Sequence, residues 1–267
     1  MISVVIPVFN QSSLTQCCLK SLLEHSARAP HGVGEVVVIN NASTDDTATV
    51  LAGFSQSFKT SGIRLQILHN DKNVGFGRAC NQGIRESKGE YLAILNNDTW
   101  LMPNWDQALM QALEKNQLDL VGPYFDEKPL SENMLDRAQT FIQKNHSGLR
   151  HHFVPILMFF KRSAIELLKF DHGGIFDERF FVTYEDTDLK HRMCLAGLKY
   201  AQTGSCYIWH RSMGTRSQKG LLPSGYEVEG LRLFIEKWKF DPRDQDHTAL
   251  AKLRRRFWKL KEKYGLF

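Results

Sequence analysis

Short apolar runs alternate with segments of helical pattern from residue 4 to residue 121, and this alternation constrains the fold more than any other feature. The apolar runs, which we interpret as buried strands, are residues 4–6, 36–39, 65–68, 91–95 and 118–121. Helix signals between them predict helices that begin near residues 12–13, 43–46, 79 and 103. Strands and helices that alternate in this way build βαβ units. The sequence therefore predicts an α/β fold with a mainly parallel sheet that is covered by helices on both faces.

The composition agrees with a folded chain of this size. The 267 residues are 42% hydrophobic and 24% charged, which supplies a full core and argues against global disorder. No apolar run reaches the roughly 18 residues that span a bilayer, and residues 1–10 lack the cationic start of a secretory signal. Five cysteines, an odd number without C-x-x-C spacing, disfavour a disulfide framework. We therefore expect a cytoplasmic protein in a reducing compartment.

The net charge of +5 is concentrated at the C-terminus. Residues 252–263 hold seven Lys and Arg against one Glu, so the rest of the chain is close to neutral. Apolar side chains at positions 250, 253, 257, 260 and 264 form one helical stripe between these cations. Such a helix suits an anionic membrane surface, or it packs its stripe on the domain and leaves the cations in solvent. The near-neutral remainder argues against a nucleic-acid partner.

The second half of the chain is patterned less clearly. Residues 123–150 are polar with few signals, and we interpret them as a long, mobile excursion. Residues 153–160 are apolar again, and residues 228–238 are amphipathic.

Polar side chains follow the ends of the predicted strands, where parallel sheets bind their ligands. They are found at residues 9–10, 40–41, 70–73 and 96–98. The carboxylate of Asp98 comes just after an apolar run, where it could hold Mg²⁺ or Mn²⁺ together with substrate phosphates. Asn and Asp also favour turns, so a simple turn is the alternative for residues 96–98.

Three carboxylates, those of Glu185, Asp186 and Asp188, lie within four residues. Mutual repulsion can prepare one of them to act as a general base. Acids also suit a solvated helix N-terminus, which is the alternative. The aromatic residues that precede them, at 176, 180 and 181, favour the wall of a pocket.

A third group of candidates surrounds His210, which follows an apolar run. This imidazole could bind a metal or a phosphate, and Arg211 and Arg216 could neutralise a diphosphate. The loop at residues 73–77 carries Gly75 and Gly77 before a helix, an arrangement that favours an anion. It is not a dinucleotide fingerprint, because the third glycine position holds Cys80, and we exclude a nicotinamide site.

Five segments in order resemble those of the family 2 glycosyltransferases, which have the Rossmann-like GT-A fold. The matching segments are residues 2–10, 37–45, 73–83, 95–99 and 176–189. The resemblance covers roughly residues 2–216 and is greatest for bacterial rhamnosyltransferases of surface polysaccharide assembly. It implies one GT-A domain at 1–240, with a nucleotide-sugar half at 1–122 and an acceptor half at 123–240, followed by a basic helical tail at 241–267.

The resemblance also implies a reaction and a set of roles. The family transfers a sugar from a nucleoside-diphosphate sugar to a hydroxyl of a glycan or lipid-linked acceptor, with inversion. Asp186 would be the base, and Glu185 or Asp188 would hold its segment by hydrogen bonds. Asp98 would bind the divalent cation, and His210 would complete the metal or phosphate contacts. The donor contacts implied by the matching segments are Pro7, Phe9, Asn40, Asn41, Ser43, Asn73, Gly75, Phe76, Arg78, Asn81 and Asn97.

Two positions depart from the family pattern. Asn96 stands where the metal motif usually begins with Asp, so a single carboxylate remains to bind the cation. Asn40 stands where an Asp usually accepts the N–H of uracil or thymine, so UDP and dTDP are preferred but other bases are less excluded. These departures leave open a degenerate GT-A module that binds sugar nucleotide or glycan without turnover. A nucleic-acid-binding protein that uses residues 252–263 is the third hypothesis.

Overall fold

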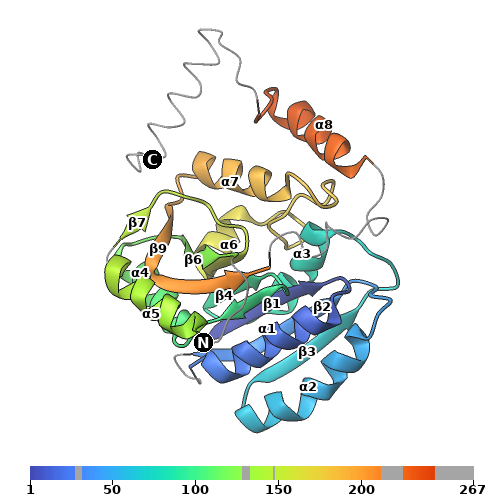
Figure 1. Cartoon of the computed structure of the whole chain (residues 1–267). Helices are drawn as coiled ribbons and strands as arrows, with labels where there is room; N and C mark the ends of the chain where they lie inside the picture. Colours follow the sequence, from blue (N-terminus) through green and yellow to red (C-terminus); the bar gives the residue numbers. More distant parts are fainter. Residues whose placement is uncertain (28–31, 128–132, 147, 212–224, 244–267) are drawn as a thin grey trace.

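The computed structural model describes residues 1–27, 32–127, 133–146, 148–211 and 225–243. In these ranges nine strands form one mixed sheet of order β3-β2-β1-β4-β8-β6-β9-β5, with β7 paired to β9 (Figure 1). The strands are β1 Ile2–Val8, β2 Val33–Asn40, β3 Arg64–His69, β4 Tyr91–Leu95, β5 Thr99–Leu101, β6 Leu120–Asp126, β7 Leu149–Arg150, β8 Leu157–Lys161 and β9 Tyr200–His210. The helices are α1 Ser12–His25, α2 Thr47–Ser61, α3 Phe76–Glu86, α4 Trp105–Lys115, α5 Met134–Asn145, α6 Arg162–Leu168, α7 Glu185–Leu195 and α8 Tyr226–Trp238.

Alternating side chains of the central strands build a core on each face of the sheet. On β1, Val4 and Ile6 point to the face covered by α1, α2 and α4. Val5 points to the opposite face, where it packs with α3, α6 and α7. All three side chains are fully buried, and burial of one such side chain stabilises the fold by about 1.5–3 kcal/mol. The predicted α/β sheet with helices on both faces is confirmed.

The N-terminal half of the sheet is parallel, which brings its strand ends to one edge. Val8 at the end of β1 pairs with Asn40 of β2, and Asn40 pairs with His69 of β3. The second half joins through antiparallel pairs of β8 with β4 and β6. Parallel ladders therefore dominate a mixed sheet, and the polar residues after β1, β2 and β3 share an edge.

Several predicted boundaries differ from those of the structure. β1 continues through Pro7 to Val8, because its pairing with β4 ends at Val5, so the missing N–H of Pro7 is not needed there. The predicted N-caps of α1 are wrong: Gln11, at φ 64°, occupies that position, and Ser12 lies inside the helix. The predicted start of α2 within residues 43–46 is also early, since the helix begins at Thr47.

The interpretation of residues 123–150 as a long, weakly patterned excursion is wrong for the part that the structure describes. Helix α5 lies within it and packs on β9 through Met134 and Ala138. Tyr124 stacks on Phe141 at 4.0 Å between ring centroids. The helix fully buries only Met134 and Ala138, and it leaves Leu135 exposed among polar side chains, which is why its signal is weak in the sequence.

Helix α8 lies beside α7 at the opposite end of the molecule from α2 (Figure 1). Among the described residues, we find no helix with the length and apolar character needed to cross a membrane. The predicted basic tail, apart from residues 241–243, lies outside the described residues.

Candidate active site

Asn41, just after β2, organises the loop that precedes α3. Its Nδ2 donates to Asn73 Oδ1 at 2.8 Å and to the Gly75 carbonyl at 3.3 Å. Its Oδ1 accepts from the Val74 N–H and from Asn70 Nδ2, both at 3.0 Å. The side chain is buried, and a buried amide with all these bonds holds its loop rigidly. Asn41 and Asn73 therefore fix the conformation of the loop before α3 through hydrogen bonds inside the protein.

A second set of bonds joins the loops after β1, β2 and β4. The Asn10 N–H donates to Ser43 Oγ at 2.8 Å. Asn97 Nδ2 donates to Thr15 Oγ1 at 2.9 Å and to the Asn10 carbonyl at 3.4 Å. Asn40 Oδ1 accepts the Ser43 N–H at 3.0 Å. These contacts place the predicted donor residues Asn40, Ser43 and Asn97 in one connected edge.

Asp98 and His210 meet although they are far apart in sequence. β5 pairs with β9 so that Thr99 lies opposite His210, and the Arg211 N–H donates to the Asp98 carbonyl at 2.9 Å. His210 Nε2 is 3.3 Å from Asp98 Oδ1, and both side chains are largely buried. The structure thus brings together two predicted metal-site residues and the backbone of Arg211. Arg216 lies outside the described residues.

The donor set of this pair fits a divalent cation. A carboxylate and an imidazole are ligands that Mn²⁺ accepts, and substrate phosphates can complete the coordination. His210 Nδ1 is buried and has no hydrogen-bond partner in the described part of the chain. The nearest acid is Glu127, whose Oε1 is 3.7 Å from this nitrogen. A carboxylate on this side of the ring is the usual partner that orients a ligating histidine.

No group of three or more acid, His or Cys side chains with metal-binding geometry occurs within the described ranges. The candidate ligands that these ranges offer are two, Asp98 and His210, and a bound diphosphate would have to supply the others. Glu127 was not anticipated from the sequence, because an exposed acid just after β6 carries no pattern that points to a metal site.

Helix α3 joins the sheet edge to the acidic segment. The fully buried Asn81 donates to the Phe176 carbonyl at 2.9 Å and accepts the Phe176 N–H at 3.0 Å. Arg78 Nε donates to the Glu178 carbonyl at 2.9 Å. The Phe76 N–H donates to the Phe181 carbonyl at 2.9 Å, and its ring meets that of Phe176 edge-on.

This contact is so close that Gly75 is required. Gly75 has φ 90°, and a Cβ there would collide with the Phe181 carbonyl oxygen. Asn81, Arg78 and Phe76 therefore bind the 176–181 segment, a structural use that adds to their predicted role at the donor.

The three predicted acids form the first turn of α7 but lie in different environments. Asp188 is fully buried, Glu185 is buried and Asp186 is partly exposed. Asp186 Oδ1 accepts from the N–H and Oγ1 of its neighbour Thr187, at 2.6 and 3.2 Å. A reacting base must reach substrate, and Asp186 lines the pocket between α7 and α8.

Asp188 anchors α8 to α7. Its carboxylate accepts from Lys237 at 2.6 Å, from Trp238 Nε1 at 2.8 Å and from Arg192 at 2.9 Å. Lys237 also reaches Asp177 at 2.8 Å. Burial alone would raise the pKa of Asp177, but hydrogen bonds from Arg179 and Lys237 outweigh it and hold this pKa well below its usual range. Asp188 is thus a positioning group for the segment that carries Asp186.

We expect the α7–α8 contact to weaken in acid because of His191. Its ring packs against Trp238 at 4.1 Å, and burial lowers its pKa from 6.5 to about 4, with a smaller contribution from Lys237. The unfolded chain then binds a proton that the folded chain does not, so stability falls as pH drops from about 6.5 to about 4. The slope from one such proton is at most about 1.4 kcal/mol per pH unit.

Urea unfolding of wild type and His191→Phe at several pH values tests this expectation. The phenyl ring keeps the aromatic packing and removes the titration, so the variant should lose less stability across this window. Equal slopes for the two proteins would show that His191 does not contribute.

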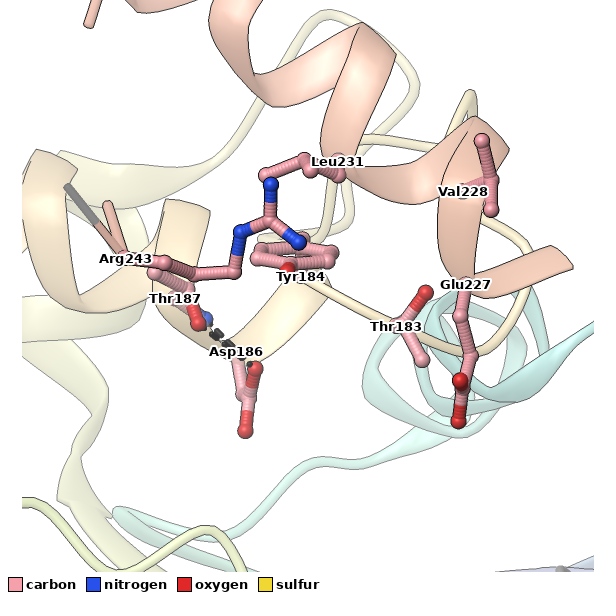
Figure 2. Close-up of a pocket in the computed structure, with 8 residues that line it drawn as sticks. All are labelled: Thr183, Tyr184, Asp186, Thr187, Glu227, Val228, Leu231 and Arg243. Atoms are coloured by element: carbon pink, nitrogen blue, oxygen red, sulfur yellow. Dashed lines mark hydrogen bonds between the residues drawn. The ribbon is translucent and has the colours of Figure 1, made fainter. Parts of the chain in front are cut away.

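A pocket of about 570 Å³ opens between α7 and α8. Figure 2 shows the Asp186 and Glu227 carboxylates projecting in the same direction, with Thr183 between them. The other lining residues are Tyr184, Thr187, Val228, Leu231 and Arg243. Tyr184 and Glu227 were missed in the sequence, although Tyr184 directly precedes the acids, and its φ of 67° is a constraint that only the structure shows.

The predicted residues therefore fall into two groups linked by α3. Asp98 and His210 form one group at the ends of β4 and β9, near the loops that carry Asn10, Asn40 and Asn97. Asp186 belongs to the other group, at the pocket on α7. Pro7 lies inside β1 opposite Ile39, and Phe9 follows the strand.

A model of the family described as glycosyl transferase family 2 matches residues 3–180. The match covers both the sheet edge and the 176–180 segment, and the chain belongs to this family. Its α/β fold with helices on both faces of a mostly parallel sheet is that of the GT-A proteins.

Two curated relatives are glycosyltransferases. GlyG of Streptococcus pneumoniae is 28% identical over 128 residues, which cover 47% of this chain and 40% of GlyG. AglE of Haloferax volcanii is 33% identical over 121 residues, which cover 45% of this chain and 38% of AglE. The chain thus matches about two fifths of the length of these relatives.

Two solved structures show the same fold. TarS of S. aureus, in complex with UDP-GlcNAc, matches with a TM-score of 0.64 at 15% identity. The match covers 99% of this chain and 74% of the TarS chain. GalNAc-T7, with UDP, GalNAc and Mn²⁺, matches with a TM-score of 0.66 at 15% identity. The match covers 89% of this chain and 48% of the GalNAc-T7 chain.

Proposed function

We propose that this protein is an inverting glycosyltransferase that moves a sugar from a nucleoside-diphosphate sugar to a hydroxyl of a glycan or lipid-linked acceptor. The observation that carries the proposal is the placement, on a family 2 fold, of the Asp98–His210 pair at the sheet edge and of Asp186 at a pocket. Complexes of TarS with UDP-GlcNAc and of GalNAc-T7 with UDP support a nucleotide-sugar donor.

The reaction is one displacement at the anomeric carbon. The acceptor oxygen forms a bond to this carbon on the face opposite the leaving diphosphate, so the configuration inverts. The bond from the anomeric carbon to the phosphate oxygen breaks, and its electron pair leaves with the nucleoside diphosphate. Asp186 takes the acceptor proton. Asp188 and Lys237 hold the helix that positions this base.

Asp98 and His210 would hold Mn²⁺ or Mg²⁺ against the diphosphate, which agrees with the Mn²⁺ in the GalNAc-T7 structure. When bound, such an ion neutralises the charge that develops on the leaving phosphate. Glu127 would orient the His210 ring through the opposite nitrogen. Arg211 and Arg216 stay predicted phosphate contacts.

We propose UDP or dTDP as the preferred donor nucleotide. The side-chain oxygen Oδ1 of Asn40 accepts the Ser43 N–H, while its Nδ2 is 3.3 Å from His69 Nδ1. The amide is therefore held in place at the sheet edge, where the family contacts the base. A rhamnosyl donor and a role in bacterial surface polysaccharide synthesis are the finer part of the proposal and rest on the resemblance of the five segments.

Docking on an anionic membrane through residues 241–267 is a further part of the proposal. It rests on the charge and apolar stripe of the sequence, since residues 244–267 lie outside the described ranges. Such docking would suit a lipid-linked acceptor and a peripheral position on the cytoplasmic side.

A calorimetric binding panel tests the proposed function. UDP, dTDP, GDP, CDP and CMP would each be titrated in Mn²⁺ and in EDTA. We expect metal-dependent binding of one uracil or thymine diphosphate, at least tenfold tighter than the others. Tight binding of CMP without metal would move the donor to a monophosphate sugar. Absence of binding by all five nucleotides would contradict the transferase and favour a degenerate module that binds glycan.

A further inference from the structure

Helix α8 packs directly against Thr183 and Tyr184, the residues that precede α7 and Asp186. A Cβ at Gly230 would lie 2.9 Å from the Thr183 carbonyl oxygen and 3.1 Å from Tyr184 Cδ2, so a glycine is needed at this contact. Thr183 Oγ1 donates to the Tyr226 carbonyl at 3.3 Å. Together with the bonds from Lys237 and Trp238 to Asp188, these contacts fix both ends of α8.

The pocket enclosed by this contact has two unlike walls. One wall, from α7 and the residues before it, presents Asp186, Thr187 and Thr183. The other wall, from the first turns of α8, presents Glu227, Val228 and Leu231. Val228 is 74% exposed, although it is an apolar side chain at the mouth of a pocket. The lining thus combines carboxylates, hydroxyls and apolar surface.

Among the described residues that line the pocket, acidic side chains outnumber basic ones. Asp186 and Glu227 project in the same direction (Figure 2). Arg243 is the cation of the lining, and its guanidinium is paired with Asp241 by bonds of 3.2 and 3.0 Å. The ion pair raises the pKa of Arg243, so this side chain stays charged, and Asp241 balances its charge. An anionic group in the pocket would therefore meet two carboxylates and one cation that is already paired with an acid.

We propose that this pocket is the acceptor subsite and that it selects a neutral saccharide over an acidic or phosphorylated one. The inference rests on the proposed function, because the attacking hydroxyl must reach Asp186. A saccharide ring presents hydroxyls and C–H faces together, and this pocket offers a partner for each. Glu227 accepts hydrogen bonds from ring hydroxyls, and Tyr184, Val228 and Leu231 contact the C–H groups.

Glu227 is then a specificity residue supplied by the part of the chain beyond the family match. The matched region ends at residue 180, whereas Asp186 and the whole of α8 follow it. The sheet-edge residues from Asn10 to Asp98 lie inside the matched region, whereas the residues that line this pocket follow it.

Nucleotide release from UDP-sugars and dTDP-sugars tests the inference. It would be measured alone, with neutral methyl hexosides, and with the methyl uronosides that differ from them by a carboxylate in place of the C6 hydroxymethyl group. The gluco, galacto and manno pairs would all be used. We expect a neutral glycoside to stimulate release with a KM at least tenfold below that of its uronoside.

Charge variants of α8 sharpen the test. Glu227→Gln should raise the KM for the neutral glycoside about tenfold, because a charged acceptor of hydrogen bonds becomes a neutral one. Glu227→Lys should narrow or reverse the preference between a glycoside and its uronoside. Glu236→Gln is the matched control, because Glu236 lies on the same helix, pairs with Arg232 and is outside the pocket.

The outcomes separate the inference from the function on which it rests. Equal use of glycosides and uronosides, or an unchanged preference in Glu227→Lys, would overturn the charge selection. Donor hydrolysis that responds to no glycoside would overturn the saccharide subsite and leave the transferase standing. Absence of both donor binding and donor hydrolysis in wild type would overturn the transferase and the subsite together.

Discussion

Asp186→Asn is expected to lower kcat by about 10²–10⁴-fold while nucleotide binding persists. The amide cannot take the proton of the acceptor hydroxyl, but it keeps the size of the side chain and its place on α7. Its Oδ1 can still accept from the Thr187 N–H, so the first turn of the helix should not change. Steady-state turnover and calorimetric binding of the donor nucleotide, measured on the same preparation, test this prediction.

Two variants separate the chemistry of Asp186 from the integrity of its helix. Thr187→Val removes one hydrogen bond at 3.2 Å and leaves the carboxylate, so kcat should fall less than tenfold. Asp188→Asn weakens the contacts with Lys237 and Trp238 and should lower the thermal midpoint, which Asp186→Asn should not. Near-normal kcat in Asp186→Asn would assign the base to another group.

The parallel half of the fold could be predicted because each of its strands contains a short apolar run, which in β3 is interrupted only by Gln66. Strand β9 escaped prediction although ten of its eleven residues are buried. Its centre holds Gln202, Thr203 and Ser205, which interrupt the apolar pattern, and their polar groups are satisfied by contacts such as that of Gln202 with the Pro123 carbonyl. A strand held by such long-range bonds has no local signal.

In the candidate site, too, some residues can be recognised from their neighbours in the sequence, whereas others join the site only through contacts with distant parts of the chain. Asp98 and Asp186 were found because each stands at a recognisable place in the chain, after a strand or among aromatic residues. Glu127, Glu227 and Lys237 belong to the site through contacts with residues far away in sequence. Nothing around them in the sequence distinguishes them from ordinary surface charges, so only the folded chain identifies them.

Asp98→Ala is expected to abolish the Mn²⁺-dependent part of diphosphate binding. Asp98 is the carboxylate of the predicted metal site, since Asn96 replaces the other acid of the family pattern. Its loss leaves His210 as the single protein ligand of the pair, which is too little to hold a hard cation in competition with water. Wild type should bind the nucleoside diphosphate at least tenfold more tightly in Mn²⁺ than in EDTA, and Asp98→Ala should bind it equally in both.

Two further variants show whether the effect comes from the metal site itself. Glu127→Gln should raise the Mn²⁺ concentration needed for tight diphosphate binding about 10–100-fold, because Glu127 faces His210 Nδ1 and acts through the imidazole ring. Glu114→Gln is the control, since this acid pairs with Tyr91 and Lys161 away from the site and should leave binding unchanged. If wild type bound the diphosphate equally in Mn²⁺ and EDTA, the reaction would not use a metal. The Asp98–His210 contact would then be a structural contact that ties β5 to β9, and Asp98→Ala would lower stability instead of donor affinity.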